Sequence, residues 1–146
     1  MLVPHTNPEM TTKRLTAVST AIEVATGIAL IAVPELVARV LLGVALSDSG
    51  VAVGRLAGFA LLSLGLACRP TADGATPSAV RALFAYNLLA ALYLGYLRVS
   101  GEFVALLLWP ACALHAGLAL LFARPACRKV SAGNGESRKA SSSQKQ

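Results

Sequence analysis

The chain has 146 residues, of which 55% are hydrophobic and only 14% are charged. Soluble domains average about 25% charged residues, so this composition excludes a disordered protein and argues against a water-soluble globule. The net charge of +6 comes from basic residues between apolar runs and in the C-terminal tail. That distribution lacks the basic stripe of a nucleic-acid-binding protein and is typical of a membrane protein.

Four apolar runs predict membrane-spanning helices. The predicted spans are residues 15–33, 51–67, 80–97 and 103–123. At about 1.5 Å per residue, such runs cover most of a ~30 Å hydrocarbon core. We therefore expect an all-α integral membrane four-helix bundle over residues 15–124. The polar residues 1–14 and 125–146 predict a disordered lead and a disordered basic tail.

A short apolar segment separates the first two spans. Residues 36–46 have apolar side chains at helical spacing and carry Arg39 among them. This pattern predicts a short amphipathic helix at the membrane interface. Asp48, Ser49 and Gly50 follow it and predict a turn.

The basic residues predict that both termini lie in the cytoplasm. With the N-terminus inside, four spans place ten of the 13 Lys and Arg residues on the inner side and leave Arg39, Arg55 and Arg98 outside. This asymmetry follows the positive-inside rule. Arg55 lies near the outer end of its span, about 6 Å deep, where its long stem can reach the interface. We expect Arg55 to be an interface anchor of a multi-pass protein in the cell membrane.

Small residues on two spans predict close helix packing. Gly54 and Gly58 form a Gly-xxx-Gly spacing with Gly65 near the same face, and Ala113 and Gly117 have the same separation in the fourth span. Lipid tails are as apolar as leucine, so close backbone approach rather than burial holds such helices together. Two interpretations stay open: packing within one bundle, or a homodimer through the second span.

Three polar side chains fall at similar depth in three different spans. Glu23 and His115 lie about 12 Å from the inner side and Asn87 about 9 Å, so we expect them to share one layer. An ionisable side chain at mid-bilayer costs about 2.5–3.5 kcal/mol. One hypothesis is a proton-linked or ligand-binding site. The alternative is a hydrogen-bond network that only fixes the bundle.

The sequence contains no pattern for soluble-enzyme chemistry. It has no HExxH, no glycine-rich phosphate loop and no GxSxG, and its three cysteines match no metal motif. We therefore expect neither enzymatic activity, nor a cofactor, nor a bound metal. Cys68, Cys112 and Cys127 are interpreted as free thiols.

Short motifs follow one another along the predicted bundle. They are Pro34-Glu35, Gly54-Arg55-Leu56-Ala57-Gly58 with Leu64-Gly65, Tyr86-Asn87, and Trp109-Pro110 with His115-Ala116. In this order they resemble the DoxX-like and related families of small bacterial four-span membrane proteins. The resemblance covers roughly residues 15–123 and implies a four-helix membrane bundle. For some members it also implies association with a quinone-linked redox complex, and it carries over no catalytic residue.

Glu23-Val24, followed by Gly27, is similar to the first span of the small multidrug-resistance transporters. Those proteins have four spans and one essential glutamate, so this resemblance implies a dimeric proton-coupled exporter. The basic tail, the surface segment and His115 depart from that pattern. The leading hypothesis is an accessory or structural membrane protein in the lipid bilayer, and it leaves open both a homodimer and an unidentified membrane partner. The alternatives are an exporter using Glu23 and a membrane subunit of a quinone-linked redox complex.

Overall fold

The computed structural model describes residues 8–101 and 105–127, and the described part is all-α. It contains five helices: α1 (Pro8–Ala32), α2 (Pro34–Leu42), α3 (Asp48–Ala67), α4 (Pro77–Ser100) and α5 (Leu108–Cys127). All but α2 are long and apolar enough to cross a membrane. The fold is the predicted four-helix bundle with a short helix after the first span, and its four apolar helices indicate a multi-pass membrane protein.

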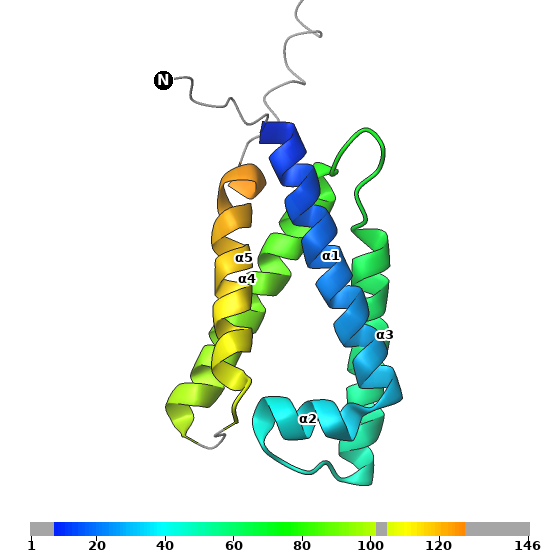
Figure 1. Ribbon diagram of the computed structural model, residues 1–146, viewed down its shortest axis with the longest axis vertical. Coiled ribbons are helices and arrows are strands. Elements are labelled where there is room, and N and C mark those ends of the chain that lie inside the picture. The colour runs from blue at the N-terminus through cyan, green and yellow to red at the C-terminus, as the bar shows by residue number, and fades with distance from the viewer. Residues whose placement is uncertain (1–7, 102–104, 128–146) are drawn as a thin grey trace, which may run out of the picture.

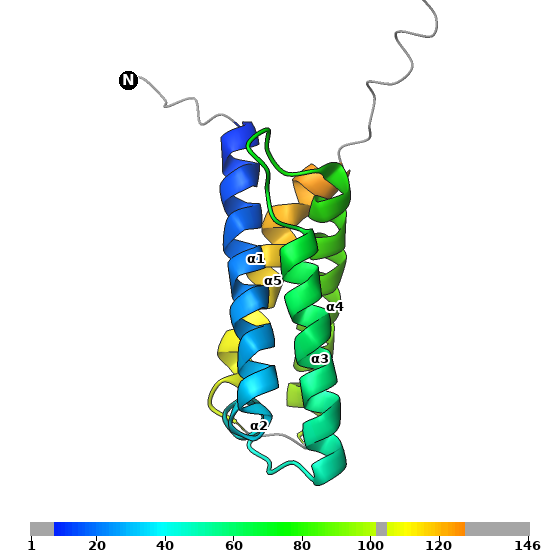
Figure 2. The same ribbon diagram turned by 90° about the vertical axis from the view of Figure 1, so that its right-hand side faces the viewer.

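The bundle is built from two helix pairs. α1 packs along α3, and α4 packs along α5. Contacts between the pairs are sparse and run mainly from α1 to α4 and α5, while α2 lies across one end and touches α5 (Figure 1). The described chain enters and leaves at the opposite end, beside the α3–α4 loop (Figure 2). Lys13 Nζ ties α1 to that loop by donating to the backbone oxygen of Ala72 over 2.9 Å.

Glycines set the distance between α1 and α3. A Cβ at Gly58 would lie 2.7 Å from the backbone oxygen of Gly27, and a Cβ at Gly65 would lie 3.0 Å from that of Thr20. Real Cβ atoms essentially never lie closer than 3.0 Å to another heavy atom, so a larger residue at Gly58 would push the two helix backbones apart, and the backbone contact at Gly65 would be unusually tight. A Cβ at Gly54 would lie 3.1 Å from the ring of Pro34. The glycine face of the second span therefore packs inside one bundle.

The small residues of α5 do not play the packing role that their spacing predicts. A Cβ built at Gly117 would meet no atom within 4 Å, and Ala113 is exposed. The contact face of α5 instead carries Leu118 and Phe122, which are buried. Bulky apolar side chains fill the interface, whereas Ala113 is exposed and the half-buried Gly117 borders open space.

Three helices begin earlier than their apolar runs. α1 starts at Pro8, so residues 8–14 are helical rather than part of a disordered lead, while residues 1–7 lie outside the described part. The predicted turn at residues 48–50 is wrong, because it is the first turn of α3. The Ser47 hydroxyl accepts from the Gly50 amide over 3.2 Å, which caps that helix. Thr76 caps α4 in the same way.

The ends of α2 and α5 also differ from the prediction. α2 stops at Leu42 because Gly43 takes a left-handed conformation with φ 77°, which glycine adopts without steric cost. α5 starts at Leu108, after the predicted residue 103, and continues through Pro125 to Cys127. The predicted tail therefore begins later, and residues 128–146 lie outside the described part.

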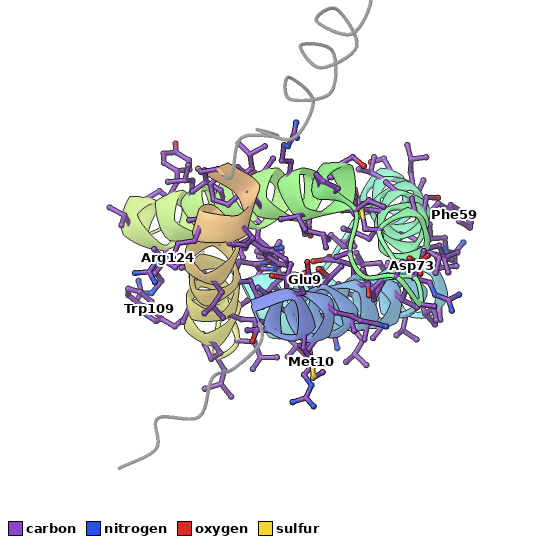
Figure 3. All side chains as sticks on the ribbon, turned by 90° about the horizontal axis from the view of Figure 1, so that it is seen from above. Glu9, Met10, Phe59, Asp73, Trp109 and Arg124 are labelled. Atoms are coloured by element: carbon purple, nitrogen blue, oxygen red, sulfur yellow. The ribbon has the colours of Figure 1, made fainter. Side chains whose placement is uncertain are left out.

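The aromatic residues at the bundle surface point outward. Trp109 lies in the first turn of α5 rather than deep in a span, and the Arg98 guanidinium stands 5.6 Å from its ring centroid. Seen from above, Met10, Phe59 and Trp109 project away from the helices (Figure 3). An apolar periphery of this kind suits contact with lipid.

The hydrophobic core lies at the end where the described chain enters and leaves. It brings together residues from the α3–α4 connection, α4 and α5: Cys68, Ala79, Val80, Leu83, Leu118 and Phe122. Leu15 and Ile22 of α1 pack against it. Below this core, toward α2, polar side chains connect the two helix pairs, and a cavity lies between the pairs.

Candidate functional site

Asn87 is the centre of a buried polar network that joins three helices. Its side-chain nitrogen Nδ2 donates to the Leu83 backbone oxygen over 2.8 Å and to Ser19 Oγ of α1 over 3.3 Å. Its oxygen Oδ1 lies 2.8 Å from Nδ1 of His115 on α5. Asn87 and Ser19 are fully buried and His115 is half-buried. One side chain of α4 thus holds α1 and α5 at the same height.

Glu23 lies beside this network but is not part of its chain of hydrogen bonds. Its side chain is only 1% exposed, and Tyr86 is its hydrogen-bonding neighbour. One carboxyl oxygen, Oε1, is buried without a hydrogen-bond partner in the described structure. Thr16 Oγ1, two turns earlier on α1, is buried in the same unpartnered way. Unpartnered buried oxygens are uncommon in folded proteins, so both mark unusual positions.

Tyr86 links Glu23 to His115. The Tyr86 ring meets the imidazole edge-on, with the ring centroids 5.7 Å apart and an interplanar angle of 83°. The three residues singled out from the sequence, Glu23, Asn87 and His115, therefore lie in one region. Asn87 and His115 are in direct contact, whereas Tyr86 stands next to the Glu23 carboxyl. Ser19 and Tyr86 complete the arrangement; their positions, one turn from Glu23 and next to Asn87, are readable in the sequence.

A half-open cavity of about 370 Å³ lies between the two helix pairs, above α2. Its wall is apolar except for His115 and Thr26, and it takes side chains from α1, α2, α4 and α5. α2 contributes Leu36, Val37, Val40 and Leu41. Pockets of about 300–1,000 Å³ with an apolar wall and a few polar groups are typical of small-molecule sites. Sequence patterning does not reveal this cavity, because it depends on the angle between the helix pairs.

Arg55 lies deeper in its helix than the sequence indicates. Because α3 begins at Asp48, Arg55 is seven residues from the helix start, about 10 Å along the axis. Its side chain is exposed and lines a second pocket of about 310 Å³ with Glu35 and Pro34. Arg55 therefore stands where α1, α2 and α3 meet, away from Glu23's neighbours Tyr86 and Asn87.

The described residues contain no cluster of three His, Cys, Asp or Glu side chains that could hold a metal ion. The three cysteines are free thiols. Comparison of the chain with family models, curated proteins and solved structures finds no match. The polar network and the cavity are therefore the features of this chain that point to a function.

Proposed function

We propose that the protein is a non-enzymatic accessory protein of the membrane that binds a small lipid-soluble molecule between its helix pairs. The observation that carries this proposal is the continuity of the cavity with the network, since His115 belongs to both. The apolar wall supplies binding by burial. The imidazole ring of His115, which is held by its hydrogen bond to Asn87, supplies one oriented polar contact. Such contacts are the usual source of specificity in small-molecule sites.

The packing of α3 favours this proposal over the dimeric exporter. A dimer through Gly58 and Gly65 needs a free glycine face, but both glycines lie against α1. An exporter also needs Glu23 to exchange with water, and its side chain is almost fully buried. These observations support a single bundle in which the polar layer organises the cavity.

Blocking the cavity tests the proposal. Ala111 lines the cavity, whereas Ala113 on the same helix is exposed on the outer surface. We expect 2-methoxynaphthalene to bind the full chain in lipid nanodiscs saturably, measured by equilibrium titration. Ala111→Phe should weaken this binding at least about 10-fold because the added ring fills the site. A 10-fold change corresponds to about 1.4 kcal/mol of binding free energy. Ala113→Phe is the matched control and should bind as the wild type does.

The same titration has a clear negative outcome. Uptake that never saturates, or that is identical in the wild type and in Ala111→Phe, would mean that the probe only partitions into lipid. The cavity would then have no role in binding, and the proposed function would be abandoned.

We infer that both ends of the chain face the cytoplasm. Among the described residues, the end that holds the α3–α4 loop carries Lys13, Arg14, Arg69, Arg81 and Arg124. The opposite end carries Arg39, Arg55 and Arg98. Cytoplasmic ends of membrane helices are enriched in basic residues, so this asymmetry supports the predicted orientation.

Thiol labelling tests the orientation. Cys127 ends α5 and is exposed, whereas Cys68 lies just beyond α3 and is buried. Burial raises the pKa of the Cys68 thiol, so less of the reactive thiolate forms at neutral pH. A membrane-impermeant maleimide should label Cys127 in inside-out vesicles but not in right-side-out vesicles, and Cys68 in neither; the Cys127→Ser variant identifies the labelled site. Labelling of Cys127 from the outer side would reverse the orientation.

A further inference from the structure

The hydrogen bonds of Asn87 fix the orientation of its side-chain amide. The Leu83 backbone oxygen can only accept, so the atom 2.8 Å from it must be the NH2 group. Both hydrogens of that group are used, one on Leu83 and one on Ser19 Oγ. Oδ1 is therefore the atom that faces His115.

This orientation determines which nitrogen of His115 carries the proton. Asn87 Oδ1 is an acceptor only, so His115 Nδ1 must donate across the 2.8 Å contact. In the neutral ring, Nε2 is then a bare acceptor. No acidic side chain lines the cavity that His115 borders, so nothing in its wall favours a doubly protonated ring. Among the described residues, the hydrogen bond of the His115 ring is made by Nδ1, and His115 is one of the residues that line the cavity.

We propose that the cavity selects a lipid-soluble alcohol or phenol, which enters from the bilayer and donates its hydroxyl to His115 Nε2. The network Ser19–Asn87–His115 makes the His115 ring an acceptor at the cavity wall, so a ligand with only acceptor atoms gains no hydrogen bond from His115. The apolar residues of α1, α2 and α5 surround the rest of the molecule. This inference rests on the proposed function and names the ligand class for the same site.

Two matched probes test the hydroxyl without changing the protein. 2-Naphthol has the donor, and 2-methoxynaphthalene has the same ring system without it. A net hydrogen bond contributes about 0.5–1.5 kcal/mol, so 2-naphthol should bind the wild-type chain in nanodiscs about 2- to 13-fold more tightly. In His115→Phe, which removes the acceptor but keeps a ring, the two probes should bind alike.

Nitrogen NMR detects a hydrogen bond between the probe and His115 Nε2 directly. The chain has two histidines, and replacing His5 by Gln leaves the His115 ring as the only histidine signal. We expect the Nδ1–H tautomer without probe, and a shift of the Nε2 signal with 2-naphthol but not with the ether.

The outcomes separate this inference from the proposed function. Equal saturable binding of both probes, blocked by Ala111→Phe, would leave the proposed function intact and overturn the alcohol preference. Tighter binding of the ether, or a proton on Nε2 before any probe is added, would overturn it as well. Saturable binding of neither probe would remove the proposed function and this inference together.

Discussion

Replacing Gly58 by alanine is expected to separate α1 from α3. The added Cβ would lie 2.7 Å from the Gly27 backbone oxygen and 3.0 Å from the Ile31 backbone nitrogen. Backbone atoms of a helix cannot move aside as a flexible side chain can, so the helices must shift apart. Overpacking of a tight interface costs about 1–3 kcal/mol. We expect a loss of that size in the free energy of unfolding, measured by SDS titration in mixed micelles with helicity as the signal.

Gly117→Ala is the matched control for this prediction. The substitution is chemically identical and is also in a helix, but the new Cβ would meet nothing within 4 Å. Alanine is a better helix former than glycine by about 1 kcal/mol, so this variant should be as stable as the wild type or slightly more. Equal effects at both positions would show that glycine flexibility, rather than close packing, governs the response. A loss confined to Gly117→Ala would instead place the important interface on the outer face of α5.

Much of the fold follows from composition and spacing because both reflect the membrane. An apolar run long enough to span the bilayer must satisfy its backbone internally, and a helix does this. Gly58 and Gly65 could be singled out for packing because their spacing places them on one helix face. The sequence left open which helix they contact, and the structure places them against α1.

The helix boundaries were harder to predict because hydrophobicity marks lipid contact and not the end of a helix. α3 and α4 begin at the polar caps Ser47 and Thr76, several residues before their apolar runs. Capping rules do identify these residues, since Ser and Thr are strongly preferred at such positions. Apolar patterning also failed at Gly117, because α5 is apolar on most faces and its packing face could not be recognised.

The candidate site was only partly accessible from the sequence for a geometric reason. Depth along a helix follows from residue number, so Glu23, Asn87 and His115 could be assigned to a common layer. Rotation about the helix axis and the tilt between the two pairs do not follow from residue number. These determine that His115 contacts Asn87 rather than Glu23, and that a cavity lies beneath them.

Replacing Asn87 by leucine is expected to uncouple the two helix pairs. The variant keeps an apolar side chain of similar size but removes the contacts to Ser19 and His115. Hydrogen bonds between membrane helices average about 0.6 kcal/mol, and a buried donor left unpaired costs about 1–3 kcal/mol. We expect a total loss of about 2 kcal/mol in SDS unfolding. The His115 ring should also lose its Nδ1–H preference, which nitrogen NMR detects and a simple loss of packing does not explain.

Glu23→Gln is the control for Asn87→Leu, because it changes the same layer outside the Ser19–Asn87–His115 chain. Glutamine keeps the size of the side chain and can still face Tyr86. If the layer organises a binding cavity, this variant should assemble normally, lose less than about 1 kcal/mol in stability and bind 2-naphthol as the wild type does, since hydrogen bonds in this environment are weak. Loss of probe binding in Glu23→Gln with the stability intact would instead make the carboxyl group essential, as the exporter hypothesis requires. Together, the two variants distinguish a binding site that depends on the ring of His115 from one that requires the carboxyl group of Glu23.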